Sequence, residues 1–265
     1  MEHIARSSPG DRADLFQEAA SRRPGLSAAI MEKDFWVCWC LKRIFSAGLP
    51  LHLLFKGGTS LSKSFHAIER FSEDVDLSFD RKELGLELGA RSDSWPSGMY
   101  AVTPYAAEVL PTAFAVASCQ VNTLEAVRTF WEKVTLLHAE CHRPDPGTKA
   151  ERTSRHYYDL YQLFRHPIGE SALRQLDLLA RVVAHKQVFF RSGWANYQTA
   201  RPGSLRLVPP ETRVAALRAD YAEMQGMIFG PVPTWDEVLD SLRALELRVN
   251  SGSSTPATGN AARRQ

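Results

Sequence analysis

Two neighbouring stretches decide the fold of this chain: Leu51-His52-Leu53-Leu54-Phe55-Lys56-Gly57-Gly58-Thr59-Ser60 and Phe71-Ser72-Glu73-Asp74-Val75-Asp76-Leu77-Ser78-Phe79. The first joins a short apolar run to a glycine pair, after which Leu61, Phe65 and Ile68 recur at helical spacing. The second alternates apolar and polar residues over its later half, which is typical of a strand. Together they predict a strand, a glycine turn, a helix and a second strand.

The glycine turn has the composition of a phosphate-binding loop. Gly57 and Gly58 carry no Cβ, so the backbone can approach an anion closely, and the N–H groups at the start of a helix favour negative charge. Thr59 or Ser60 can add a hydroxyl contact. A Gly-Gly pair is also a common ordinary turn, and that alternative stays open for this element taken alone.

Two acidic residues on the second strand are candidate metal ligands. Asp74 and Asp76 are two positions apart, so on a strand their side chains project from the same face. Paired carboxylates hold one or two Mg²⁺ ions, which stabilise the incoming and leaving oxygens of an in-line phosphoryl or nucleotidyl displacement. The alternative is a solvated strand face, although like charges this close are unfavourable on a strand.

Composition indicates a globular protein with room for one large domain or two modest ones. Of the 265 residues, 44% are hydrophobic and 23% are charged, which are ordinary values for a soluble fold. The net charge of +2 gives only a weak indication of an anionic partner. Four cysteines are too few for a disulfide framework in a chain of this length, so we expect free thiols and a reducing compartment.

No segment predicts a membrane partner. The longest apolar run, residues 35–49, is interrupted by Lys42 and Arg43 and is shorter than the roughly 20 residues of a membrane-spanning helix. The first residues lack the apolar segment of a signal peptide. We therefore expect a cytoplasmic protein.

The rest of the chain is mostly helical in pattern. Residues 11–47 predict two helices with Ser27 as the cap of the second, residues 82–97 predict an insertion or a mobile connection, and residues 100–121 contain β-type segments. Further helices are predicted over residues 124–142, 157–164, 170–190, 210–228 and 235–247. We interpret residues 1–150 as one lobe with N-terminal helices, 151–250 as a helical lobe and 251–265 as a disordered tail.

The two deciding stretches resemble the signature of a known family. Phe55–Lys63 followed by Arg70–Leu77 is similar to the motif of the AbiEii/MenT toxins, which belong to the DNA-polymerase-β-like nucleotidyltransferase superfamily. The resemblance covers about residues 30–250 and continues through residues 132–138, 155–160, 185–190 and 220–224. It implies an α+β nucleotidyltransferase fold, a mixed β-sheet flanked by helices, with a C-terminal helical lobe.

The resemblance also implies a set of site residues. Lys133 can offset the negative charge of a triphosphate, and Asp159 can orient that lysine or help activate the acceptor hydroxyl. Without the resemblance, a solvated helix face for Lys133 and an ion pair of Asp159 with Arg155 are the simpler interpretations. The implied catalytic residues are Asp74, Asp76, Lys133 and Asp159, and the implied metal ligands are Asp74 and Asp76. The implied nucleotide-binding residues are Gly57, Gly58, Thr59, Ser60, Lys63 and Lys186.

The implied activity is that of a toxin from a toxin–antitoxin pair with a role in phage defence. Such an enzyme uses Mg²⁺ or Mn²⁺ to transfer a nucleoside monophosphate, expected to be a pyrimidine nucleotide, from an NTP to the 3′ end of tRNA, which blocks aminoacylation and translation. A cognate antitoxin protein is the implied partner. Ser72 resembles the position where some members are inactivated by phosphorylation. The alternatives are a nucleotidyltransferase acting on a small molecule or protein, and a catalytically inactive binding module of the same fold.

Two further groups carry a weaker signal. His138, Cys141 and His142 have the i, i+3, i+4 spacing of metal ligands on a helix, but no fourth ligand is apparent, and ordinary packing is the alternative. Basic and aromatic residues between Arg191 and Arg213 are candidates for an RNA surface, with core aromatics and solvated arginines as the alternative.

Overall fold

The computed structural model describes residues 1–49, 52–79, 95–144 and 152–252. The chain forms two compact units: Met1–Glu125 with Gly226–Val232, called here the first unit, and Ala126–Gln225 with Pro233–Gln265, the second unit. Most of the predicted insertion and of the predicted tail lies outside the described residues. All four cysteines are free thiols, as expected.

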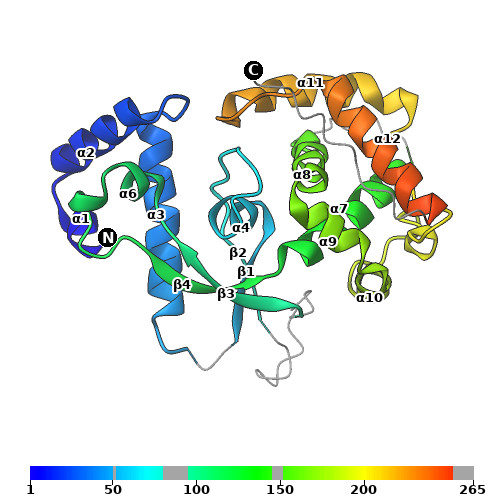
Figure 1. The fold of residues 1–265 in the computed structure, drawn as a ribbon, viewed down its shortest axis with the longest axis horizontal. Helices are drawn as coiled ribbons and strands as arrows, with labels where there is room; N and C mark the ends of the chain where they lie inside the picture. The colour runs from blue at the N-terminus through cyan, green and yellow to red at the C-terminus, as the bar shows by residue number, and fades with distance from the viewer. Residues whose placement is uncertain (50–51, 80–94, 145–151, 253–265) are drawn as a thin grey trace, which may run out of the picture. The chain divides into compact units, whose positions relative to one another are not determined.

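The first unit contains a four-stranded mixed sheet in the order β2-β1-β4-β3 (Figure 1). Its strands are β1 (Leu53–Lys56), β2 (Asp76–Phe79), β3 (Ser97–Val102) and β4 (Cys119–Leu124). β1 pairs antiparallel with β2 and parallel with β4, and β4 pairs antiparallel with β3. The register places Lys56, the last residue of β1, opposite Asp76, the first residue of β2. The mixed sheet of the expected α+β fold is therefore confirmed.

Helices pack beside this sheet because their apolar residues face it. The first unit contains α1 (Glu2–Arg6), α2 (Pro9–Arg22), α3 (Ala28–Phe45), α4 (Gly57–Lys63), α6 (Tyr105–Val109) and a 3₁₀ turn η1 (Pro111–Ala113). The predicted cap is confirmed, since the Ser27 hydroxyl accepts the N–H of Ile30 at the start of α3. Phe35 on α3 is fully buried, its ring lies 5.5 Å from that of Phe16 of α2 at a tilt of 49°, and both join Phe55 of β1 in the core.

The second unit is helical, which agrees with the expected C-terminal helical lobe (Figure 1). It contains α7 (Ala126–Cys141), α8 (Ser154–Arg165), α9 (Pro167–Leu173), α10 (Leu176–Phe189), the 3₁₀ turn η2 (Tyr197–Thr199), α11 (Glu211–Met224) and α12 (Trp235–Ser251). The 3₁₀ turn η3 (Gln225–Met227) follows α11, where the chain passes into the first unit. Trp235 is buried between the rings of Tyr157 and Tyr221. A capping box of Thr234 and Glu237 begins α12.

Three predicted elements differ from the observed ones. The helix after the glycine turn ends at Lys63 instead of continuing to Ile68, because His66 adopts a left-handed conformation with φ 49°. The helix predicted over residues 170–190 is two helices, because the backbone of Gln175, between α9 and α10, is not helical (φ −122°, ψ 58°). The segment predicted as β-type between residues 100 and 121 also contains α6 and η1.

Within the described residues, every helix is too short or too polar to cross a bilayer.

Candidate active site

The glycine turn lies where β1 passes into α4. Its first residue must be glycine because of the backbone conformation and the space available there. Gly57 has φ +82°, a conformation that residues with a Cβ rarely adopt. A Cβ at this position would also lie 2.1 Å from Oδ2 of Asp76. The side chain of Asp76 therefore rests on the backbone of the turn, as the register of β1 and β2 requires.

The space beside the second glycine is filled by side chains other than Asp76. A Cβ at Gly58 would lie 2.7 Å from a guanidinium nitrogen of Arg70 and 3.5 Å from the Ser72 hydroxyl. Arg70 is 2% exposed and donates to the Phe71 carbonyl at 3.2 Å. A buried positive charge thus lies directly against the turn.

The two hydroxyls that follow the glycines hold the turn together. Thr59 Oγ1 donates to the Asp74 carbonyl at 2.6 Å and lies 3.3 Å from the Ser72 carbonyl. Ser60 Oγ donates to the Gly57 carbonyl at 2.8 Å. Both side chains are buried, so they fix the backbone of the turn and of residues Ser72–Asp76, called here the acidic segment. The local hydrogen bonds explain why small hydroxyl residues occupy these positions.

The strand carrying the acids is shorter than predicted. β2 begins at Asp76, and Asp74 lies in the extended segment before it. Pairing stops there because β1 ends opposite Asp76 and the chain turns into α4. The carbonyl of Asp74 accepts the Thr59 hydroxyl in place of a strand partner. Both acidic side chains are nevertheless exposed, whereas Ser78 further along the strand is buried.

The acidic segment has the donor chemistry for a hard divalent cation. Asp74 and Asp76 present two exposed carboxylates beside the turn, and a Cβ at Gly57 would fill the space that the Asp76 carboxylate occupies. The neighbouring carboxylate of Glu73 is engaged elsewhere, in an ion pair with Lys33 at 2.7 Å. Mg²⁺ is usually bound by one or two carboxylates with substrate phosphates and water as the other ligands, so the residues fit the ion.

Lys63 is located in the core of the first unit. Its ammonium is 2.9 Å from Oδ1 of Asp34 on α3 and lies 3.5 Å above the ring of Tyr105. The other Asp34 oxygen accepts the Tyr105 N–H at 2.6 Å. Burial would lower the pKa of Lys63, but the Asp34 carboxylate overrides it and raises that pKa. With its side chain 1% exposed, Lys63 joins α4 to α3 rather than presenting a charge to solvent.

The second unit brings the other predicted residues together. Lys133 on α7 donates to Oδ2 of Asp159 on α8 at 2.7 Å, and its Nζ is 3.5 Å from Nδ1 of His156. Asp159 is fully buried and Lys133 is 6% exposed. Two charges this deeply buried are stable only as a pair with good hydrogen bonds. An ion pair across two helices therefore replaces the solvated helix face that was the simpler interpretation for Lys133.

The side chain of Lys186, on α10, also extends to α7 beside Lys133. Its Nζ donates to the carbonyl of Glu132 at 2.9 Å, one residue before Lys133, and the side chain is 9% exposed. The Glu132 carboxylate pairs with Arg128 at 3.3 Å. All three predicted residues of the second unit thus meet around residues 132–133 of α7.

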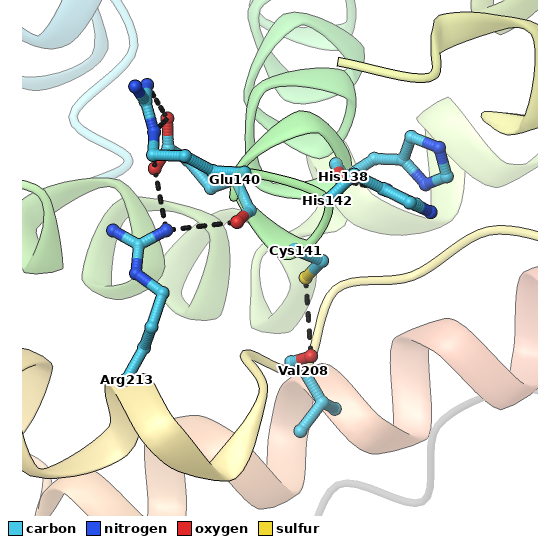
Figure 2. Close-up of polar contacts among 7 residues, drawn as sticks. His138, Glu140, Cys141, His142, Val208 and Arg213 are labelled. Atoms are coloured by element: carbon cyan, nitrogen blue, oxygen red, sulfur yellow. Dashed lines mark hydrogen bonds and ion pairs between the residues drawn. The ribbon is translucent and has the colours of Figure 1, made fainter. Parts of the chain in front are cut away.

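The side chains of His138 and Cys141 on α7 bond to backbone groups of the same unit. Nδ1 of His138 accepts the Arg206 N–H at 3.1 Å, and Nε2 is 3.2 Å from the Asn196 carbonyl. Cys141 Sγ donates to the Val208 carbonyl at 3.2 Å (Figure 2). The imidazole centroids of His138 and His142 are 4.5 Å apart. Among the described residues, no three His, Cys, Asp or Glu side chains are grouped to hold a metal.

Glu140 on the same helix supports the packing interpretation. Its carboxylate pairs with the guanidinium of Arg213 at 2.9 Å (Figure 2). It also pairs with the guanidinium of Arg143 at 2.6 Å. These two bonds outweigh burial and lower the pKa of Glu140. The region ties α7 to α11 and to the segment before it. Arg213, weighed as an RNA contact, is therefore a structural residue.

Sequence reasoning assigned no role to Arg70 and His156. Both residues lie within the stretches that carry the family resemblance, and this location is the sequence feature that could have indicated a role for them. Their contacts depend on residues that are distant in sequence or on another helix, which periodicity does not indicate.

Comparison with known proteins agrees with these motifs. The family model described as "Nucleotidyl transferase AbiEii toxin, Type IV TA system" matches residues 39–85 and 80–241, more than half of the chain. No curated protein matches. Among solved structures, the chain is similar to MenT4, a nucleotidyltransferase toxin from Mycobacterium tuberculosis H37Rv, with 19% identity, a TM-score of 0.49, and coverage of 90% of this chain and 87% of that one.

Proposed function

The chain belongs to the family of AbiEii nucleotidyl transferase toxins of type IV toxin–antitoxin systems, and from this premise we propose that it transfers a nucleoside monophosphate from an NTP to the 3′ end of tRNA. The modified tRNA would not be aminoacylated, and translation would stop. A cognate antitoxin protein counteracts this activity in the cell. The observation that carries the proposal is the pair of exposed carboxylates, Asp74 and Asp76, beside the Gly57-Gly58 turn.

In this proposal the turn binds the triphosphate through its backbone. The hydroxyls of Thr59 and Ser60 already bond to carbonyls, so the N–H groups at the start of α4 are the donors available for phosphate oxygens. The buried guanidinium of Arg70 adds positive charge against Gly58. Lys63 acts indirectly, by fixing α4 on α3.

Asp74 and Asp76 would hold Mg²⁺ or Mn²⁺ in the proposed reaction. The ion, when bound, neutralises the phosphates and stabilises the charge that develops on the attacking and leaving oxygens. In the proposed reaction the bond between the α- and β-phosphates breaks, so that pyrophosphate leaves. The 3′-oxygen of the acceptor forms the new bond to the α-phosphorus, and the proton of that hydroxyl is lost to solvent.

Lys133 and Asp159 supply the second part of the proposed chemistry. The Lys133 ammonium offsets negative charge on the phosphates, and Asp159 holds it in one orientation through their 2.7 Å hydrogen bond. Lys186 contributes a further positive charge next to Lys133. These roles extend the family's chemistry to matching positions of this chain.

One experiment tests the proposal and separates it from its rivals. Purified protein is incubated with Mg²⁺, total tRNA and each α-labelled NTP in turn, and parallel reactions contain aminoglycosides or a protein mixture. We expect label in tRNA, from CTP or UTP, and none with Asp76→Ala. Label only in a small molecule or protein would favour the other acceptors. Growth inhibition that persists in Asp76→Ala would favour an inactive binding module.

A further inference from the structure

The segment Gly226–Val232, called here the return segment, packs within the first unit although α11 before it and α12 after it belong to the second. Phe71 N–H donates to the Met227 carbonyl at 2.8 Å, and Phe229 N–H donates to the Glu69 carbonyl at 3.0 Å. Arg70 and Ile228 form the antiparallel bridge between these two bonds. The return segment is thus a short strand partner for residues 69–71.

Side chains hold the return segment in place. Ile228 is 9% exposed, and the ring of Phe229 packs on Tyr105 with centroids 5.5 Å apart. The guanidinium of Arg23 lies 4.5 Å from the Tyr105 ring and 5.7 Å from the Phe229 ring. The segment is therefore built into the core of the first unit and does not lie loosely on its surface.

The fit is tightest at Gly230. A Cβ at this position would lie 1.8 Å from Oε2 of Glu69, 2.5 Å from its Cδ and 2.7 Å from its Cβ. The first two atoms belong to a flexible side chain, but the Glu69 Cβ moves only with the backbone. By contrast, a Cβ at Gly226, in the same segment, would meet nothing within 4 Å.

This pairing anchors one end of the acidic segment. Residues 69–71 lead directly into Ser72–Asp76, and at the far end Thr59 binds the Asp74 carbonyl. Asp76 then enters β2 opposite Lys56. The backbone that carries the two carboxylates is therefore held at one end by Thr59, which precedes Asp74 by 15 positions, and at the other end by a segment more than 150 positions later.

We propose that the return segment is a positioning element for nucleotidyl transfer, which sets the places of the Asp74 and Asp76 carboxylates through its pairing with residues 69–71. This inference rests on the proposed function. It assigns a role in the reaction to residues that carry no catalytic group themselves. Displacement of the segment should weaken metal-supported catalysis before it unfolds the protein, because small shifts of ligating groups are costly.

Gly230→Ala tests the inference, with Gly226→Ala as the matched control. The transfer rate is measured against Mg²⁺ concentration, and folding is followed by circular dichroism and thermal melting. We expect Gly230→Ala to raise the Mg²⁺ concentration for half-maximal rate about tenfold, with Gly226→Ala unchanged. The double variant Glu69→Gly, Gly230→Ala removes the Glu69 side chain that the new Cβ at residue 230 would meet. Its Mg²⁺ concentration for half-maximal rate should therefore return toward that of Glu69→Gly alone.

The outcomes separate this inference from the proposed function. If the wild-type protein transfers no nucleotide, the proposed function itself is contradicted. An active wild type, an inactive Asp76→Ala and a folded Gly230→Ala with an unchanged Mg²⁺ requirement would overturn the positioning role alone. Should Gly230→Ala not fold, Ile228→Ala loosens the same bridge more gently, and an unchanged Mg²⁺ requirement in that variant would likewise overturn it.

Discussion

Oδ2 of Asp76 lies against the α-carbon of Gly57, so close that a Cβ on residue 57 would stand 2.1 Å from it. The contact joins the two motifs that define the proposed site. It also explains why the turn requires glycine for two separate reasons: the left-handed φ of +82° and the occupied space. The two reasons can be separated by mutation.

Gly57→Ala is expected to abolish transfer, with a loss of at least about 100-fold, because the new Cβ must displace the Asp76 carboxylate. The positive φ alone should cost about 1–3 kcal/mol of unfolding free energy. Gly203→Ala is the control, since Gly203 has φ +89° with nothing within 4 Å of its Cβ position. It should lose stability but keep the wild-type rate. Equal rates for the two variants would contradict the importance of the contact.

Lys133→Met is expected to lower both activity and stability. It leaves the fully buried Asp159 carboxylate without the charge 2.7 Å away, which should cost about 3–5 kcal/mol in urea unfolding. The double variant Lys133→Met, Asp159→Asn removes both charges and should regain much of that stability while remaining inactive. A double variant as unstable as the single one would argue against a charge-pairing explanation.

The buried imidazole of His138 predicts a pH dependence of stability. Burial lowers its pKa from 6.5 to about 4, so the folded protein favours the neutral ring. The unfolded chain binds the proton more readily, and stability present above pH 6.5 is lost as the pH falls toward 4. The loss should be about 2–3 kcal/mol. Urea unfolding from pH 7 to pH 4.5 should show this slope in the wild type and a shallower one in His138→Gln.

Asp220 on α11 caps helix α8, which carries Asp159. Its carboxylate accepts the N–H groups of Arg152 at 2.6 Å and Ser154 at 2.7 Å, and the N-cap Thr153 makes no side-chain cap bond. Asp220→Ala should cost about 1–2 kcal/mol and speed hydrogen exchange in the first turn of α8. Asp240→Ala on α12, which removes an exposed ion pair with Arg243, should change stability by less than about 1 kcal/mol.

Ser72 lies close enough to the glycine turn for a phosphate on its hydroxyl to affect nucleotide binding there. Its hydroxyl is 3.5 Å from the Cβ position of Gly58, and a phosphate there would add a charge of about −1.5 to −2 beside the proposed triphosphate site. Ser72→Glu should therefore reduce transfer by raising the KM for NTP, while Ser72→Ala should stay near the wild-type rate. The comparison is made from initial rates over a range of NTP concentrations, and equal KM values would count against electrostatic regulation.

Local sequence signals predicted the local elements well. The Ser27 cap of α3 and the passage from β1 through the glycine turn into α4 are confirmed, because caps, strands and turns depend on residues within a few positions of one another. Element ends were less predictable. The end of α4 depends on the left-handed His66, and the start of β2 depends on where β1 stops.

The sequence by itself determined the family, the order of first strand, glycine turn, helix and second strand, and the acidic pair beside that turn. Only the tertiary structure decided which charges are buried: Lys63 pairs with Asp34 on α3, and Lys133 with Asp159 on α8. Only the tertiary structure, too, brought the return segment to residues 69–71. The physical reason is that pairing and burial depend on proximity in space, which hydrophobic periodicity along one element does not specify.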